Sequence, residues 1–220
     1  MDIFRNARYS PGSAIKPRAP LPTPRRDRLR WRPRRAVRII LWAVLGLPAG
    51  LGLYLAGLQL TGNIHTVEPG ALYRSAQLGE GALADVIDDY HIKSVINLRG
   101  AVPQASWYRS EIAVSRARGI VHYDLPMSAN NLVEPSTMAR ISTLLRSAPK
   151  PVLIHCQSGA DRSGLVAALY EYAIAARPPE EAQEQLSLLY GHFPYLWSRT
   201  GAMDKSFEIF VRQNSPKPGA

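Results

Sequence analysis

One uninterrupted apolar run constrains the chain more than any other feature and divides it into three parts. The segment IILWAVLGLPAGLGLYLAGL, Ile39 to Leu58, contains no charged side chain. A helix of this length spans about 30 Å, roughly the hydrocarbon thickness of a bilayer. Pro48 interrupts the run near its middle, which membrane helices tolerate better than soluble ones. We therefore expect a transmembrane anchor over residues 36–60; a buried core helix and a cleaved signal peptide are the alternatives.

The positive charge of the chain is concentrated before this run. The net charge is +10, and residues 1–38 carry 12 Lys and Arg against 2 Asp, whereas the remainder carries 15 charges of each sign. Residues 39–220 are therefore balanced, which argues against a nucleic-acid-binding face on a folded domain. Residues 59–70 contain no Lys or Arg. The positive-inside rule then predicts a single-pass (inner) membrane protein with a cytoplasmic N-terminus and its later residues on the far side, the periplasm in a Gram-negative cell.

The segments outside the anchor differ in character. Residues 1–35 are rich in Arg and Pro without apolar periodicity, so we expect a disordered cytoplasmic tail, and residues 215–220 a short flexible one. Residues 63–214 alternate β-branched runs with helical patterns, which predicts an α/β domain with a mainly parallel central sheet of about four to five strands flanked by helices. Strands are expected at 92–98, 120–125 and 152–156, and helices at 81–90, 105–117, 135–148, 163–176 and 179–191.

The chain has one cysteine, and its position is unusual. Cys156 ends the apolar strand VLIHC, and the loop Gln157, Ser158, Gly159, Ala160, Asp161, Arg162 leads into a helix that begins at Ser163. A strand-to-helix loop of this kind points backbone N–H groups and the positive end of the helix dipole into one concavity. Both favour an anion, either the thiolate of Cys156 or a phosphate bound by residues 157–162, with Arg162 as a two-pronged donor.

This arrangement predicts a reaction. A thiolate below a bound phosphoryl group can attack in line, form a cysteinyl-phosphate and expel the alcohol, after which water hydrolyses the intermediate. The hydroxyl of Ser163 is expected to help the sulfur leave, and His155 to orient the loop. The sequence has no Cys-x-x-Cys or His-x-x-x-His pair, so we expect neither a metal nor a cofactor.

The segment resembles the signature of the protein-tyrosine and dual-specificity phosphatase superfamily, His-Cys-x5-Arg-Ser/Thr-Gly, which is complete from His155 to Gly164. The stretches 72–78, 92–100, 122–130 and 191–207 also resemble bacterial members, so that the similarity covers most of residues 64–210. It implies a dual-specificity-phosphatase-like fold. Rhodanese-type sulfurtransferases have a shorter cysteine loop, and low-molecular-weight phosphatases carry theirs near the start of the chain.

The general acid that protonates the leaving group is left open by the sequence. Asp124 lies 32 residues before Cys156, a distance that resembles the acid-bearing loop of dual-specificity phosphatases. Asp161 lies within the cysteine loop, where myotubularin-like lipid phosphatases carry an aspartate to which the acid role is assigned. Glu134 opens the next predicted helix and is the third candidate. We rank Asp124 first and Asp161 second.

Two arginines are supporting candidates, and the substrate is open. Arg74 and Arg99 end predicted strands, where side chains in parallel sheets line the active-site crevice. The expected partners are the membrane, through residues 39–58, and a phosphorylated protein, lipid or saccharide. A protein phosphatase of the tyrosine or dual-specificity type and a phosphatase of envelope lipids or saccharides are both consistent with the sequence, and a phosphate-binding pseudophosphatase is the alternative from another class.

Overall fold

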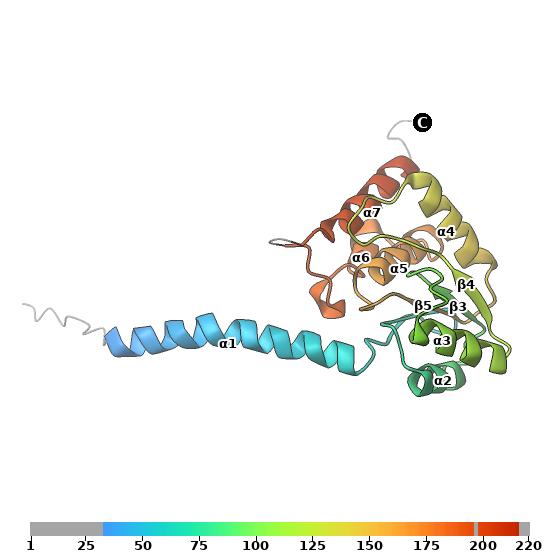
Figure 1. The fold of residues 1–220 in the computed structure, drawn as a ribbon. Helices are drawn as coiled ribbons and strands as arrows, with labels where there is room; N and C mark the ends of the chain where they lie inside the picture. Colours follow the sequence, from blue (N-terminus) through green and yellow to red (C-terminus); the bar gives the residue numbers. More distant parts are fainter. Residues whose placement is uncertain (1–32, 196–197, 216–220) are drawn as a thin grey trace, which may run out of the picture. The chain divides into compact units, whose positions relative to one another are not determined.

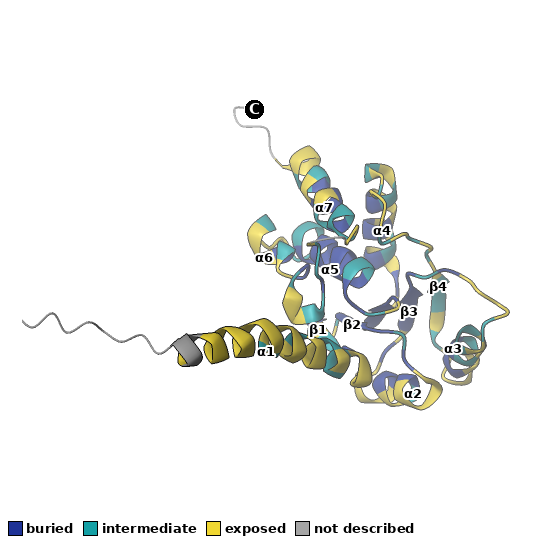
Figure 2. Cartoon of the chain, turned by 60° about the vertical axis from the view of Figure 1, so that its left-hand side comes forward, coloured by how far each residue is buried: buried dark blue, intermediate teal, exposed yellow. Residues whose placement is uncertain are grey.

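The computed structural model describes residues 33–195 and 198–215, so the predicted tails at 1–35 and 215–220 lie almost entirely outside the described residues. Contacts divide the chain into two compact units, Met1–Val44 and Leu45–Ala220. The first long element is α1 (Pro33–Leu60), and its stretch Val37–Leu60 is long and apolar enough to cross a membrane. Most of its large apolar side chains are exposed, as the yellow helix in Figure 2 shows. The membrane crossing itself stays a prediction.

A five-stranded sheet organises the second unit, in the order β1-β2-β5-β3-β4. Only the pairing of β1 with β2 is antiparallel, and the other three pairings are parallel. The strands are short, and β5 lies at the centre, next to β2 and β3. Their bounds are β1 (His65–Glu68), β2 (Leu72–Ser75), β3 (Ser94–Asn97), β4 (Val121–Asp124) and β5 (Val152–His155).

Helices cover both faces of this sheet (Figure 1). One face packs against α2 (Glu80–Asp89) and α3 (Ser106–Ala117). The other packs against α4 (Pro135–Ser147), α5 (Asp161–Ala173), α6 (Pro179–Gln183) and α7 (Gly201–Asn214). Successive strand residues point to opposite faces, so Leu153 joins the first apolar core and Ile154 the second. The most deeply buried elements are β2, β3, β5 and α5, drawn largely in dark blue in Figure 2, whereas β4 at the sheet edge is partly exposed.

The predicted fold class is confirmed, with differences in detail. The strands expected at 92–98, 120–125 and 152–156 are β3, β4 and β5, each shorter than its apolar run. The helix expected at 179–191 is instead α6 followed by the 3-10 turn η1 (Leu188–Tyr190), because the chain leaves the helical path after Gln183. The patterns did not predict α7, which packs Met203, Phe207 and Phe210 against the core of α5.

Candidate active site

The cysteine loop lies at the carboxyl end of the central strand. β5 ends at His155, Cys156 follows it, and α5 begins at Asp161. The carboxyl ends of parallel strands form the crevice in which α/β proteins bind ligands. The loop therefore occupies the position that the sequence predicts for an anion site.

Four consecutive backbone carbonyls of this loop are held from behind. Each accepts a hydrogen bond from a residue outside the loop. The bonds run from Gln77 N to Gln157 O (3.2 Å), from Asn63 Nδ2 to Ser158 O (2.9 Å), and from Arg74 Nη2 to Gly159 O (2.7 Å) and Ala160 O (2.9 Å). In a trans peptide the N–H points away from the C=O. The N–H groups that follow these carbonyls are consequently turned toward the front of the loop, as an anion site requires.

Arg74 supports the loop from within the protein. Its side chain is fully buried, and Nη1 also donates to the backbone oxygen and the Oε1 of Gln185, both at 2.8 Å. Burial lowers the pKa of Arg74 to about 10, so the guanidinium is charged at neutral pH. Gly159 sits tightly above β2, with φ of +74° and no room for a Cβ, which would lie 2.7 Å from the backbone nitrogen of Ala76. Glycine is thus required at this turn.

An open pocket of about 540 Å³ lies in front of the loop. It is lined by Gln59, Met127, Ser128, Ala129, Asn130, Gln157, Ser158, Asp161, Arg162 and Thr200. Arg162 Nη1 donates to the carbonyls of Leu98 and Met127, each at 3.3 Å, and its buried Nε has no hydrogen-bond partner within the described residues. A buried guanidinium nitrogen without a partner is costly. It is therefore a donor available to a ligand in this pocket.

Cys156 and Ser163 lie at the base of the loop. Cys156 is 1% exposed, borders the apolar core of α5, and begins the loop whose later residues line the pocket. The hydroxyl oxygen of Ser163 is buried and has no partner in the part of the chain that the structure describes. The hydroxyl of Ser163 is therefore available to a ligand, although neither Cys156 nor Ser163 is among the residues that line the pocket.

Asp161 lines the pocket and is held by a buried histidine. His192 Nδ1 lies 2.7 Å from Asp161 Oδ1, and its Nε2 lies 2.8 Å from Asp204 Oδ2. Burial alone would lower the pKa of His192, but the hydrogen bonds with the two carboxylates raise it to about 9. His192 is consequently protonated at neutral pH and donates to both aspartates.

This arrangement predicts that stability depends on pH through His192. The folded-state pKa is raised above the ordinary value of 6.5, so the stabilisation is complete below pH 6.5 and is lost as the pH rises through about 9. We expect the melting temperature of the wild type to fall over this window. The free energy of unfolding should decrease by no more than about 1.4 kcal/mol per pH unit, the limit for one proton. His192→Gln should flatten the slope, whereas the exposed His91→Asn should keep it. Equal slopes in the wild type and His192→Gln would refute this assignment.

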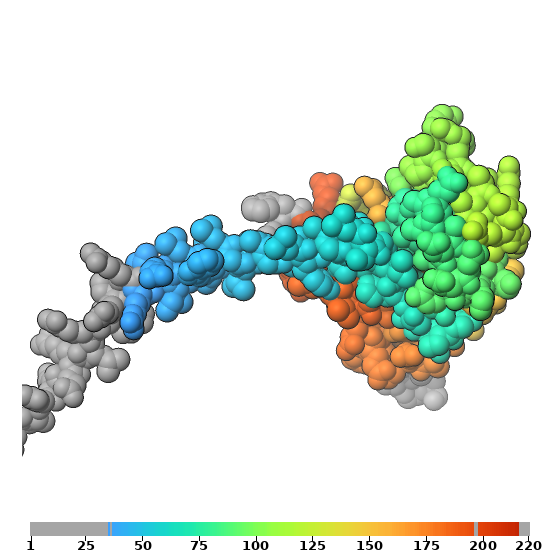
Figure 3. Space-filling model, turned by 90° about the horizontal axis from the view of Figure 1, so that it is seen from below, coloured from blue at the N-terminus to red at the C-terminus, as the bar shows by residue number. Residues whose placement is uncertain are grey.

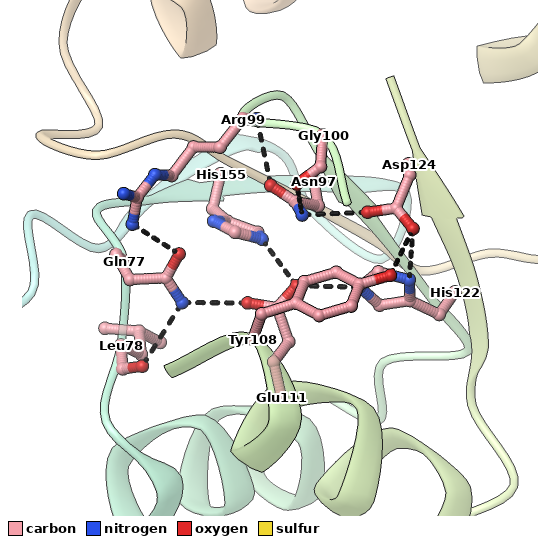
Figure 4. Close-up of polar contacts among 10 residues, drawn as sticks. All are labelled: Gln77, Leu78, Asn97, Arg99, Gly100, Tyr108, Glu111, His122, Asp124 and His155. Carbon is pink, nitrogen blue, oxygen red and sulfur yellow. Dashed lines mark hydrogen bonds and ion pairs between the residues drawn. The ribbon is translucent and has the colours of Figure 1, made fainter. Parts of the chain in front are cut away.

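Asp124, the other candidate acid, belongs to a different set of contacts (Figure 4). Its Oδ2 accepts a hydrogen bond from the hydroxyl of Tyr108 at 2.6 Å, and its Oδ1 accepts one from Asn97 Nδ2 at 2.9 Å. This carboxylate raises the pKa of Tyr108 to about 12. Asp124 is not among the residues that line the pocket, and neither is Glu134, which precedes α4.

A buried carboxylate holds His155, the residue before the cysteine. Glu111 on α3 lies 3.1 Å from His155 Nε2, 2.7 Å from His122 Nε2 and 2.8 Å from Gln77 Nε2, as Figure 4 shows. Burial alone would raise the pKa of Glu111, but hydrogen bonds from the two histidines and Gln77 lower it to about 2. Glu111 therefore stays ionised and fixes the end of β5 against α3.

Arg99 packs beside this network. Its guanidinium lies over the ring of Trp107, 3.9 Å from the centroid, and Nη1 donates to Gln77 Oε1 at 3.3 Å. Neither Arg99 nor Arg74 lines the pocket; Arg74 contacts the loop from behind. Among residues 33–195 and 198–215, no three His, Cys, Asp or Glu side chains are grouped so as to hold a metal ion.

Several contacts of the site are not encoded in a local motif. Sequence spacing did not identify Asn63, Gln59 or Glu111, and it gave His192 no definite role. Asn63 and Gln59 reach Ser158 across 95 and 99 residues. Asn63 and Gln59 could have been identified only from their position along the chain. Both are polar amide residues between the apolar run and the first strand, next to the folded domain.

The mainly parallel sheet and the strand–loop–helix turn at its carboxyl edge agree with the phosphatase-like fold that the signature residues predict. The chain belongs to the tyrosine phosphatase family, whose sequence model matches residues 55–180. No curated protein matches the sequence.

Solved structures share the fold at low sequence identity. TpbA from P. aeruginosa is 22% identical with a TM-score of 0.52, covering 70% of this chain and 85% of its own. The core catalytic domain of the PP-IP phosphatase SIW14 from S. cerevisiae is 18% identical with a TM-score of 0.51, covering 69% and 92%. PTPMT1 is 14% identical with a TM-score of 0.50, covering 68% and 97%. Each matches most of its own length, so this chain contains a complete domain of that fold.

Proposed function

We propose that this protein is a membrane-anchored phosphatase that hydrolyses phosphate monoesters through a cysteinyl-phosphate intermediate. The observation that carries the proposal is the loop from Gln157 to Ala160, whose four carbonyls are bound from behind, together with the buried Arg162 Nε, which has no partner among residues 33–195 and 198–215. Preorganised donors of this kind stabilise a phosphoryl group throughout its transfer.

In the first step, the sulfur of Cys156 attacks the phosphorus of the bound ester. The S–P bond forms as the ester P–O bond breaks, and the electron pair leaves with the alcohol oxygen. Asp161, which lines the pocket with Arg162, donates the proton that this oxygen needs. Protonated His192, whose Nδ1 lies 2.7 Å from Asp161 Oδ1, can supply a proton to this carboxyl group.

In the second step, water attacks the phosphorus of the cysteinyl-phosphate and gives its proton to Asp161. The S–P bond breaks, the electron pair returns to the sulfur, and inorganic phosphate leaves. Ser163, whose hydroxyl has no partner within the described part of the chain, donates a hydrogen bond to the departing thiolate. Arg162 and the backbone N–H groups hold the phosphoryl group through both steps.

The anchor and the orientation belong to the same proposal. The apolar part of α1 supports one membrane crossing, and the arginines before it support a cytoplasmic N-terminus. The catalytic domain then lies on the opposite side of an inner membrane.

The fold alone leaves the substrate open. Among the structures similar to this chain, TpbA is solved in complex with phosphotyrosine, and SIW14 is a PP-IP phosphatase. The test of the proposed reaction is therefore a generic aryl phosphate. We expect the wild type to release phosphate from it in the presence of a chelator and the Cys156→Ser variant to be inactive. A pseudophosphatase would bind phosphate without turnover, and that result would overturn the proposal.

A further inference from the structure

The C-terminal end of α1 forms part of the wall of the active-site pocket. Gln59, on its last turn, lines the pocket together with Gln157 and Arg162. Gln59 Nε2 also donates to the carbonyl of Ser158 at 3.1 Å, so it touches the cysteine loop directly. Asn63, three residues after the helix ends, donates to the same carbonyl at 2.9 Å. The segment expected to cross the membrane thus contributes to the site itself.

This contact fixes how far the pocket lies from the bilayer. The apolar run ends at Leu58, and Gln59 is the next residue. A helix rises about 1.5 Å per residue, so the pocket wall begins within about one helical turn of the end of the run. The headgroup layer extends roughly 5–8 Å beyond the hydrocarbon core. The pocket consequently begins at the depth of the lipid headgroups.

A second surface feature also places this part of the domain at the depth of the lipid headgroups. The turn η1 carries two exposed apolar side chains, Leu188 at 42% and Leu189 at 61%. The hydroxyl of Tyr54 on α1 donates to the carbonyl of Leu189 at 2.6 Å, and Figure 3 shows the cyan end of α1 beside this orange segment. Tyr54 lies four residues before Leu58, one turn deeper in the apolar run. Leu189 is therefore held at the membrane interface, where an exposed apolar side chain is stabilised by lipid.

We propose that the pocket takes its substrate from the bilayer, namely the phosphate monoester headgroup of a membrane lipid. This inference rests on the proposed function. The headgroup enters the pocket past the wall that Gln59 forms, while its acyl chains stay in the leaflet against Leu188 and Leu189. Hydrolysis releases inorganic phosphate to water and leaves the lipid alcohol in the membrane. A phosphotyrosine on a soluble peptide gains nothing from this placement.

The test uses the full chain reconstituted in phosphatidylcholine vesicles that contain phosphatidic acid, a long-chain phosphate monoester. Phosphate release is compared with release from a phosphotyrosine peptide at equal ester concentration and from a soluble aryl phosphate. We expect the vesicle lipid to be hydrolysed at least about tenfold faster than the peptide. In Leu189→Asp, the ratio of lipid to aryl phosphate turnover should fall about tenfold, because a charged side chain leaves the interface.

Leu132→Asp is the matched control, since Leu132 is a leucine of similar exposure, 51%, on the loop before α4. It should keep the wild-type ratio. Equal or faster hydrolysis of the peptide, or an unchanged ratio in Leu189→Asp, overturns the lipid proposal while the phosphatase proposal stands. A wild type that hydrolyses none of the three substrates overturns both.

Discussion

The Cys156→Ser variant is expected to lose hydrolysis of every phosphate ester by about 10⁴-fold or more. Serine nearly matches the size of cysteine, so the loop keeps its anchoring bonds to Arg74 and Asn63. A hydroxyl is far less acidic than a thiol, and the loop therefore holds no comparable nucleophile. Because Cys156 is the one cysteine of the chain, no other thiol can substitute for it. Steady-state phosphate release from an aryl phosphate measures the loss.

The control for this variant is phosphate binding. Arg162 and the backbone N–H groups remain in Cys156→Ser, so inorganic phosphate should still bind and raise the melting temperature. Loss of both phosphate binding and turnover would indicate that the substitution disturbs the loop. An unchanged melting temperature of the ligand-free variant excludes such a disturbance. Full turnover by the serine variant is incompatible with the proposed reaction.

The second large effect is expected at Asp161. Asp161→Asn removes the proposed proton donor but keeps an oxygen that can accept from His192. We expect kcat for an alkyl phosphate, whose leaving group needs a proton, to fall by about 10²- to 10⁴-fold. For an aryl phosphate with an acidic leaving group, kcat of the same variant should fall much less. The dependence of kcat on leaving-group acidity therefore measures the proton transfer itself.

Asp124→Asn is the matched control for Asp161→Asn. Asp124 is held by Tyr108 and Asn97, away from the residues that line the pocket. Its replacement should change kcat little and should leave the leaving-group dependence of the wild type. If Asp124→Asn instead produces the large loss, the general acid is Asp124, the residue that distance from Cys156 along the sequence favours.

The fold and the central loop could be predicted because their signals are local. The apolar runs of β3, β4 and β5 alternate with helical patterns, and the signature from His155 to Gly164 is contiguous. Strand ends were less accurate, because an apolar run continues past the last paired residue, as it does after Asn97. α7 was not predicted, although its apolar residues Met203, Phe207 and Phe210 recur at helical spacing and pack against α5.

The supporting contacts could not be predicted because they join residues far apart in the chain. Arg74 reaches Gly159 across 85 residues, and His192 reaches Asp161 across 31. Nothing in the spacing distinguishes an arginine that faces substrate from one that is buried behind a loop. The sequence could not decide between Asp124 and Asp161 for the same reason. Distance along the sequence does not show which carboxylate lines the pocket.

The central claim is that a phosphoryl group passes through the sulfur of Cys156. The most direct measurement is rapid acid quenching during turnover of an aryl phosphate, followed by mass spectrometry of the peptides. We predict one phosphoryl group on the peptide that contains Cys156, absent from Cys156→Ser and lost when the quench follows exhaustion of the substrate. Steady turnover with the phosphoryl group on another residue, or with none on the protein, would contradict this account.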